Sequence, residues 1–174
     1  MIVLNHRGFT FIELMVTLII LGIVIAISTV SFQSLIADQA LSKAASQVYY
    51  TLQLAKTEAI KRNQKIYVQF CQQQSVWKMG LSDFSGCDCF TANSCQLDGI
   101  EKVQELADGK KILIDESDIR FTDSQASYGA LRFSVETGSI ILTNQYNKRL
   151  SIIQSAMRLR VCAPGQDYLG YKQC

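Results

Sequence analysis

Six cysteines are the residues of this chain whose type and spacing suggest chemistry most directly. Four lie in the middle of the chain and two near its end: Cys71, Cys87, Cys89, Cys95, Cys162 and Cys174. Thiols at short spacing either hold a metal or pair as disulfides. The single histidine, His6, lies at the other end of the chain, so the cysteines have no imidazole near them in the sequence. We therefore expect disulfides and no metal site.

The remaining residues show no arrangement typical of an active site. The sequence has no nucleophile–base pair, no glycine-rich phosphate loop and no paired-carboxylate signature. We therefore expect no enzyme, no catalytic residue and no cofactor. Binding and structural roles remain as the functions to consider.

Glu13 is the single charged residue of an apolar segment, residues 9–30. A helix of that length spans about 30 Å, the thickness of the hydrocarbon core of a bilayer. A secretory signal peptide would have several basic residues before a shorter apolar run and small residues at its cleavage site, and both are missing. We expect a retained membrane anchor in a single pass, with Arg7 on the cytoplasmic side.

A carboxylate in lipid costs about 3 kcal/mol, so Glu13 needs an explanation. Its side chain either reaches the interface from its place near the start of the segment, or it pairs with a positive group of another subunit. The run from Arg7 to Leu14, RGFTFIEL, resembles the class III signal of type IV prepilins and type II secretion pseudopilins. The resemblance implies that a prepilin peptidase cuts between Gly8 and Phe9 and methylates the new amino terminus. It also implies that Glu13 pairs with the N-terminus of a neighbouring subunit during assembly.

A second helical pattern follows the apolar segment. Residues 31–62 contain no proline or glycine, and small or aliphatic residues recur at steps of three and four. This period predicts one helix from about residue 9 to about residue 62, whose second half packs on a globular domain. The residues of the packed stripe are Leu41, Ala45, Val48, Leu52, Ala55 and Ala59.

After Asn63 the apolar residues alternate with polar ones, which predicts strands. The expected strands are residues 66–70, 76–79, 111–114, 130–135, 139–143, 149–153 and 157–162, with turns at 136–138 and 146–148. A long helix followed by antiparallel strands is an α+β fold. The layout resembles the GspH/FimT subfamily of minor pilins and pseudopilins, in which a hairpin near the C-terminus closes the sheet. The expected organisation is a leader at 1–8, an anchor at 9–30, an amphipathic helix at 31–62 and a β domain at 63–174, with a cysteine-rich loop at about 81–99 and a C-terminal tail.

The anchor's orientation places all six cysteines beyond the inner membrane, where disulfides persist. Six cysteines allow fifteen pairings. We expect Cys162 to bond Cys174 and so to fix the C-terminal tail to the last strand. Cys71 is expected to pair with one member of the cluster formed by Cys87, Cys89 and Cys95, and the other two members with each other. A bond between Cys87 and Cys89 is disfavoured because alternate residues of an extended chain point apart.

Charge is unevenly distributed along the 174 residues, although the net charge is only +2. Residues 83–123 carry ten acidic and four basic side chains, whereas residues 132–174 carry six basic and two acidic ones. The low total excludes a polycation that wraps nucleic acid along its whole length. The basic C-terminal region is the part that could bind anions.

The last hairpin concentrates three arginines. With a two-residue turn at Gln154-Ser155, Arg149 lies opposite Arg160, and Arg158 shares their face. The other face then carries the apolar residues Leu150, Ile152, Met157, Leu159 and Val161. Arginines on an edge hairpin prevent aggregation, or they bind phosphates through their guanidinium groups.

The resemblance bears on this choice. DNA-binding members of the FimT type carry a Gly-Arg-x-Arg motif in this hairpin, and residues 157–160, MRLR, keep both arginines but lack the glycine. One hypothesis is a minor type IV pilin, at or near the pilus tip, that supports assembly and binds double-stranded DNA for natural transformation. The alternative is a GspH-like pseudopilin of type II secretion with a structural role. The implied partners are pilin or minor pilin subunits, the prepilin peptidase and the inner membrane; the protein would then pass to the periplasm and the extracellular pilus.

Overall fold

A single long helix, α1 (Phe11–Arg62), forms the first part of the fold. The computed structural model describes residues 10–107, 111–131 and 134–174, without the side chains of residues 27–31. The helix ends where Asn63 takes a left-handed conformation, with φ of 52°, and the Gln64 N–H donates back to the Ala59 carbonyl at 3.3 Å. The positive side chains of Lys61 and Arg62 in the last turn interact favourably with the negative end of the helix dipole. The continuous helix agrees with the sequence prediction.

The chain divides into two units, residues 1–36 and 37–174. In the first unit, the described side chains from Thr10 to Ala26 are all exposed. Among the described residues, no helix combines the length and the apolar character that crossing a membrane requires. The expected leader, residues 1–8, and the expected new N-terminus, Phe9, lie outside the described residues.

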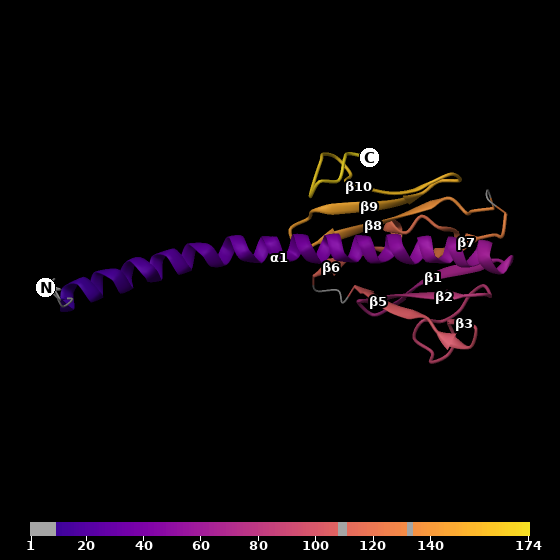
Figure 1. The fold of residues 1–174 in the computed structure, drawn as a ribbon, viewed down its shortest axis with the longest axis horizontal. Coiled ribbons are helices and arrows are strands. Elements are labelled where there is room, and N and C mark those ends of the chain that lie inside the picture. Colours follow the sequence, from indigo (N-terminus) through magenta and orange to yellow (C-terminus); the bar gives the residue numbers. More distant parts are fainter. Residues whose placement is uncertain (1–9, 108–110, 132–133) are drawn as a thin grey trace, which may run out of the picture. The chain divides into compact units, whose positions relative to one another are not determined.

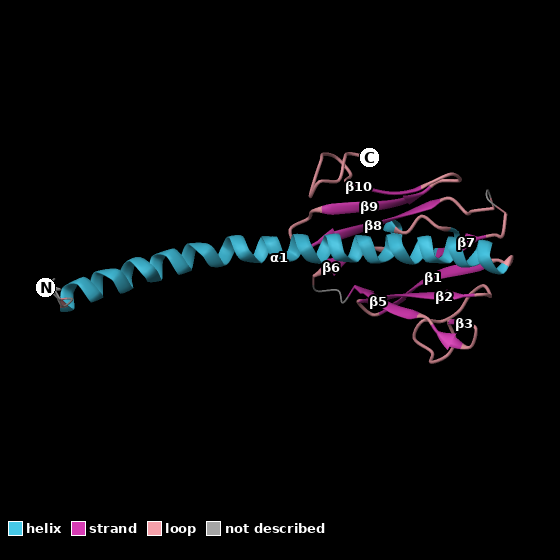
Figure 2. Ribbon diagram, in the orientation of Figure 1, coloured by secondary structure: helices cyan, strands magenta, loops and turns pink. Residues whose placement is uncertain are grey.

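The second unit is an antiparallel β domain covered by the C-terminal half of α1 (Figures 1 and 2). One four-stranded sheet has the order β5-β2-β1-β7, a second has the order β10-β9-β8-β6, and β3 and β4 form a small hairpin. The fold is therefore α+β, as predicted. The strands are β1 (Ile66–Gln73), β2 (Val76–Ser82), β3 (Gln96–Leu97), β4 (Ile100–Glu101), β5 (Val103–Ala107), β6 (Ile112–Leu113), β7 (Gln125–Tyr128), β8 (Gly138–Asn144), β9 (Arg149–Gln154) and β10 (Leu159–Cys162).

The core of the domain forms between α1 and the two sheets. All six residues of the predicted helical stripe are fully buried, which confirms the stripe. On β1, Ile66, Val68 and Phe70 are buried in alternation with partly exposed neighbours, as the two-residue period predicts. Burying one such aliphatic or aromatic side chain contributes about 1.5–3 kcal/mol, so packing on the domain is what keeps this part of the helix in place.

The strand expected at residues 130–135 is wrong. The strand of this region is β7, which ends at Tyr128, and the chain then turns back at Gly129, whose N–H donates to the Ser134 carbonyl. A Cβ at Gly129 would lie 2.3 Å from the Ser134 Oγ, so the loop needs glycine at its first position. β5 and the β3–β4 hairpin were not predicted, because they lie in the acidic region. Gln104 and Glu105 are both exposed on β5 and break the expected alternation.

The expected register of the last hairpin is also wrong. Four residues, 155–158, connect β9 and β10, so Arg160 pairs with Ile153 and lies away from Arg149, which pairs with Thr143 on β8. The longer turn is closed by Ser155, whose N–H and Oγ both donate to the Arg158 carbonyl. An even-length turn preserves the two faces, so Leu150 and Ile152 remain on the core side. Met157 does not join them: it is 76% exposed in the turn.

Candidate functional site

The N-terminal candidate residue, Glu13, lies exposed in the first turn of α1. Its backbone N–H donates to the Thr10 Oγ1 at 3.3 Å, so Thr10 acts as the N-cap of the helix. A carboxylate in the first turn also interacts favourably with the helix dipole. From Phe11 to Ala37 the sequence contains no other charged residue. The predicted cleavage residues, Gly8 and Phe9, lie outside the described residues.

All six cysteines are paired. The bonds join Cys71 to Cys89, Cys87 to Cys95, and Cys162 to Cys174. The predicted bond of the tail and the predicted division of the cluster are therefore both confirmed, and the sequence alone had left the partner of Cys71 open. Within the residues that the structure describes, no group of three His, Cys, Asp or Glu side chains is placed to hold a metal ion.

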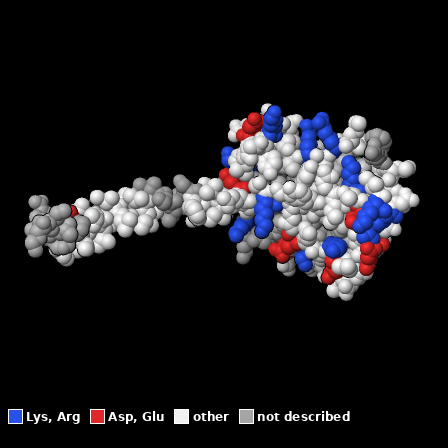
Figure 3. Space-filling view, viewed as in Figure 1, with Lys and Arg blue, Asp and Glu red and all other residues white. Residues whose placement is uncertain are grey.

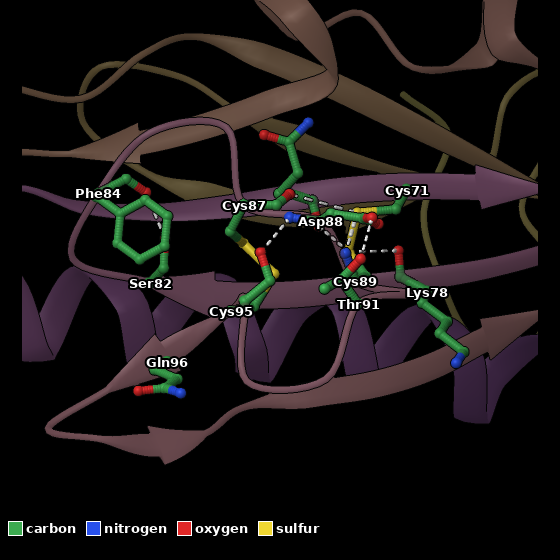
Figure 4. The surroundings of a disulfide bond; sticks show 12 residues. Cys71, Lys78, Ser82, Phe84, Cys87, Asp88, Cys89, Thr91, Cys95 and Gln96 are labelled. Atoms are coloured by element: carbon green, nitrogen blue, oxygen red, sulfur yellow. Dashed lines mark hydrogen bonds between the residues drawn. A yellow bond between two sulfur atoms is a disulfide. The ribbon is translucent and has the colours of Figure 1, made fainter.

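The Cys71–Cys89 disulfide attaches the cysteine-rich loop to β1, and the Cys87–Cys95 disulfide closes the loop on itself (Figure 4). The Cys89 N–H donates to the Cys71 sulfur at 3.1 Å, which places the loop backbone directly against β1. Asp88 accepts hydrogen bonds from the Thr91 hydroxyl at 2.7 Å and the Phe90 N–H at 2.9 Å, and these bonds lower the pKa of its carboxyl. The loop is thus a rigid structural element.

The C-terminal tail, residues 163–174, is fixed on α1. The Tyr168 hydroxyl donates to the Asp38 carboxylate, and the Tyr171 hydroxyl lies 3.3 Å from the Ser42 Oγ. Asp38 also accepts from the Asn144 Nδ2 at 3.0 Å, so one carboxylate joins the helix, the tail and β8. Burial, and then the bond to Asp38, raise the pKa of Tyr168, which keeps its hydroxyl a donor.

The three predicted arginines are exposed but do not form one compact patch. Arg149 begins β9, Arg158 lies in the β9–β10 turn and Arg160 lies on β10, the edge strand of its sheet. In the described parts of the chain, no acidic side chain lies within 4.0 Å of any of them. The partner of Arg160, Ile153, lies four steps along β9 from Arg149, a distance of about 13 Å. Figure 3 shows basic side chains along the edge of the domain where β10 lies.

A fourth basic residue was missed by the sequence analysis. Lys148 precedes Arg149 in the β8–β9 turn, and its Nζ lies 5.4 Å from the centre of the Tyr168 ring. Its position directly before Arg149 was visible in the sequence. Its place beside the tail was not, because the tail lies twenty residues further along the chain and reaches this turn only through the fold.

Comparison with known proteins connects these features to a family. Residues 44–168 match the family described as Type II transport protein GspH, and residues 4–29 match the prokaryotic N-terminal methylation motif. No curated protein matches the chain. The structure of the minor pseudopilin EpsH from the Type 2 Secretion System of Vibrio cholerae is similar in fold, with a TM-score of 0.51 at 18% sequence identity. The similarity covers 72% of this chain and 98% of EpsH.

The GspH match extends from the packed half of α1 to the C-terminal tail, which is more than half of the chain. The methylation motif covers the segment that contains Gly8, Phe9 and Glu13. The long helix on two antiparallel sheets agrees with both matches. This chain belongs to the GspH family of minor pilins and pseudopilins.

Proposed function

We propose that the chain is a minor subunit of a type IV pilin-like filament and that it enters the filament through residues 9–30. The observation that carries this proposal is Glu13, the one charged residue in an exposed apolar helical stretch that matches the methylation motif. A carboxylate there is unfavourable in lipid unless a positive group neutralises it. The freed amino terminus of a neighbouring subunit supplies such a group. Before assembly the same segment anchors the subunit in the inner membrane, with the β domain in the periplasm.

Processing between Gly8 and Phe9 tests the first step of this proposal. Replacing Gly8 with valine should leave the leader attached, because the peptidase must accommodate the residue before the cut. Mass spectrometry of the purified protein should find Met1 or its neighbours at the N-terminus, and the parent protein should begin with a methylated Phe9. Asn5→Ala is the control and should be processed normally. A Gly8→Val protein that begins at Phe9 would contradict the assigned cleavage site.

Which kind of filament the chain enters is a separate question. EpsH belongs to a type II secretion system, which supports the pseudopilin role as the alternative to a type IV pilus subunit. Both roles use the same N-terminal segment. A position at or near the tip of the filament stays a prediction, which immunogold labelling of filament ends checks.

DNA binding is a second proposed function, supported by the exposure of Arg149, Arg158 and Arg160 and by the lack of acidic side chains near them in the described residues. Guanidinium groups free of carboxylates can grip phosphates bidentately. Because the arginines are spread along the hairpin, each would contact a different phosphate. Double-stranded DNA with its regular phosphates is the ligand that such spacing fits.

The double variant Arg158→Gln/Arg160→Gln should weaken DNA binding about tenfold and lower the slope of log K against log salt by about 2, because two phosphate contacts disappear. Gel-shift titrations of the full-length chain at several salt concentrations measure both quantities. In cells, transformation should fall while filaments persist. Arg120→Gln/Lys65→Gln removes the same charge elsewhere and should leave the slope nearly unchanged. Equal slopes for both variants would remove the DNA-binding proposal.

A further inference from the structure

A hollow of about 400 Å³ lies between the β8–β9 turn and the C-terminal tail. Its lining includes two basic side chains and two side-chain amides, and no acidic residue. Figure 1 shows the tail looping back over the end of β9 that lies next to this turn. The volume falls within the range of small-molecule sites. The lining residues are Asn147, Lys148, Arg149, Ala163, Pro164, Gly165, Gln166 and Tyr168.

The turn side of the hollow is built on Asn144, which is 1% exposed. Its Oδ1 accepts hydrogen bonds from the backbone N–H groups of Tyr146 and Lys148, each at 3.0 Å. Asn147 takes the left-handed conformation, with φ of 59°, that this tight turn requires. The backbone that presents Lys148 and Arg149 is therefore fixed before any ligand arrives.

The tail side is equally constrained. The Cys162–Cys174 disulfide closes it, and the Ala163 N–H donates to the Lys172 carbonyl at 2.9 Å. Tyr168 and Tyr171 exchange backbone hydrogen bonds at 3.0 and 2.9 Å. The Tyr168 side chain is held by Asp38 at its hydroxyl, and its ring lies under the Lys148 ammonium. The described neighbour of this ammonium is therefore a ring rather than a carboxylate, which leaves its N–H donors for a ligand.

The two acidic groups near the hollow, Asp38 and Asp167, each accept hydrogen bonds. Asp38 accepts from Tyr168 and Asn144, and the Asp167 carboxylate accepts from the Gln173 N–H at 2.8 Å. Asp115 and Asp118 line a different hollow, of about 470 Å³, which shares Arg149 and Asn147 with this one. Among the described residues, no carboxylate lies within 4.0 Å of the charged groups of Lys148 or Arg149, and both side chains line the hollow.

We propose that this hollow binds an anionic group, a carboxylate or a phosphate, between Lys148 and Arg149. The side-chain amides of Asn147 and Gln166 supply neutral donors beside the two cations. The ligand is then a small acidic molecule, such as a uronic acid or a sugar phosphate, of about the size of one monosaccharide. This site goes beyond the proposed filament and DNA-binding roles, because it depends on Lys148 and on the tail.

The test uses the full-length chain in zwitterionic detergent, titrated with inorganic phosphate and with glucuronate. Backbone amide shifts of residues 147–149 and 163–166 should saturate with at least one of the two probes. Lys148→Gln and Arg149→Gln should each weaken binding about fivefold, because each removes a charge-assisted hydrogen bond. Arg158→Gln and Arg160→Gln lie on the same hairpin but outside the hollow, and they should change the affinity less than about twofold.

Saturation with glucuronate alone assigns a carboxylate ligand, and saturation with phosphate alone assigns a phosphorylated one. Shifts spread equally over the lysines of α1 would overturn the proposal. So would equal losses in the Lys148→Gln and Arg160→Gln proteins. Arg149 is common to this proposal and to the DNA-binding proposal, so the two are separated by the other residues: Lys148 belongs to the hollow alone, and Arg158 and Arg160 belong to the DNA-binding face alone.

Discussion

Replacing Gly80 with alanine should prevent the Cys87–Cys95 disulfide from forming in its native position. A Cβ at Gly80 would lie 2.3 Å from the Cys95 sulfur and 2.7 Å from its Cβ. Neither atom can move away, because the sulfur is bonded to Cys87 and the residue is fully buried against β2. Losing a disulfide that closes so short a loop costs about 2.5 kcal/mol on the entropic estimate.

Two measurements on the purified full-length protein check this. Alkylation under denaturing conditions should label two thiols in the variant and none in the parent, and Tm should fall by about 8 °C. Gly22→Ala is the matched control, because no atom lies within 4 Å of a Cβ built there. A Gly80→Ala protein with three disulfides and an unchanged Tm would show that β2 can shift to accept the methyl group.

The sequence predicted those parts of the fold that depend on short-range regularities. The helical stripe and the β1 alternation were predicted because burial follows a local period, as at Leu52 and Val68. The Cys162–Cys174 bond was predicted because it would fix the C-terminal tail to the last strand. The fold class followed from the order of these patterns along the chain.

Contacts between residues that are far apart in the chain could not be predicted from the sequence. The contact of Asp38 with Tyr168 spans 130 residues, and nothing in the local pattern of either residue indicates it. Cys71 bonds Cys89, rather than Cys87 or Cys95, because Cys89 lies against β1. The folding of the loop determines that position, and the local sequence does not indicate it. The turn at residues 155–158 differs from the expected one because Ser155 closes a four-residue turn through its side chain.

The candidate sites show the same division. Glu13 stood out because a single charge interrupts an apolar run, which is a local signal. The sequence predicted which residues of the last hairpin share a face, and the structure retains that division. How close Arg149 and Arg160 lie depends on the length of the turn, which was predicted wrongly. Lys148 was not predicted as a site residue, because the Tyr168 ring that it contacts belongs to a tail without any periodic pattern.

Replacing Glu13 with glutamine should abolish most filament incorporation without affecting processing. Glutamine keeps the size and hydrogen-bonding capacity of the side chain but removes the charge that attracts a neighbouring amino terminus. Incorporation should fall at least about tenfold, which corresponds to a loss of about 1.4 kcal/mol or more per subunit contact. The measurement is the ratio of this protein in sheared filaments to that in membranes, with the N-terminus identified by mass spectrometry.

A Thr10→Ala variant separates this electrostatic effect from helix capping. Thr10 Oγ1 accepts the Glu13 N–H, so its loss weakens the start of α1 by about 1 kcal/mol while the carboxylate remains. If pairing with an amino terminus is what matters, Thr10→Ala subunits should still enter filaments and Glu13→Gln subunits should not. Equal incorporation of the Gln variant and the parent would mean that the carboxylate has no partner, and the proposed route into the filament would lose its support.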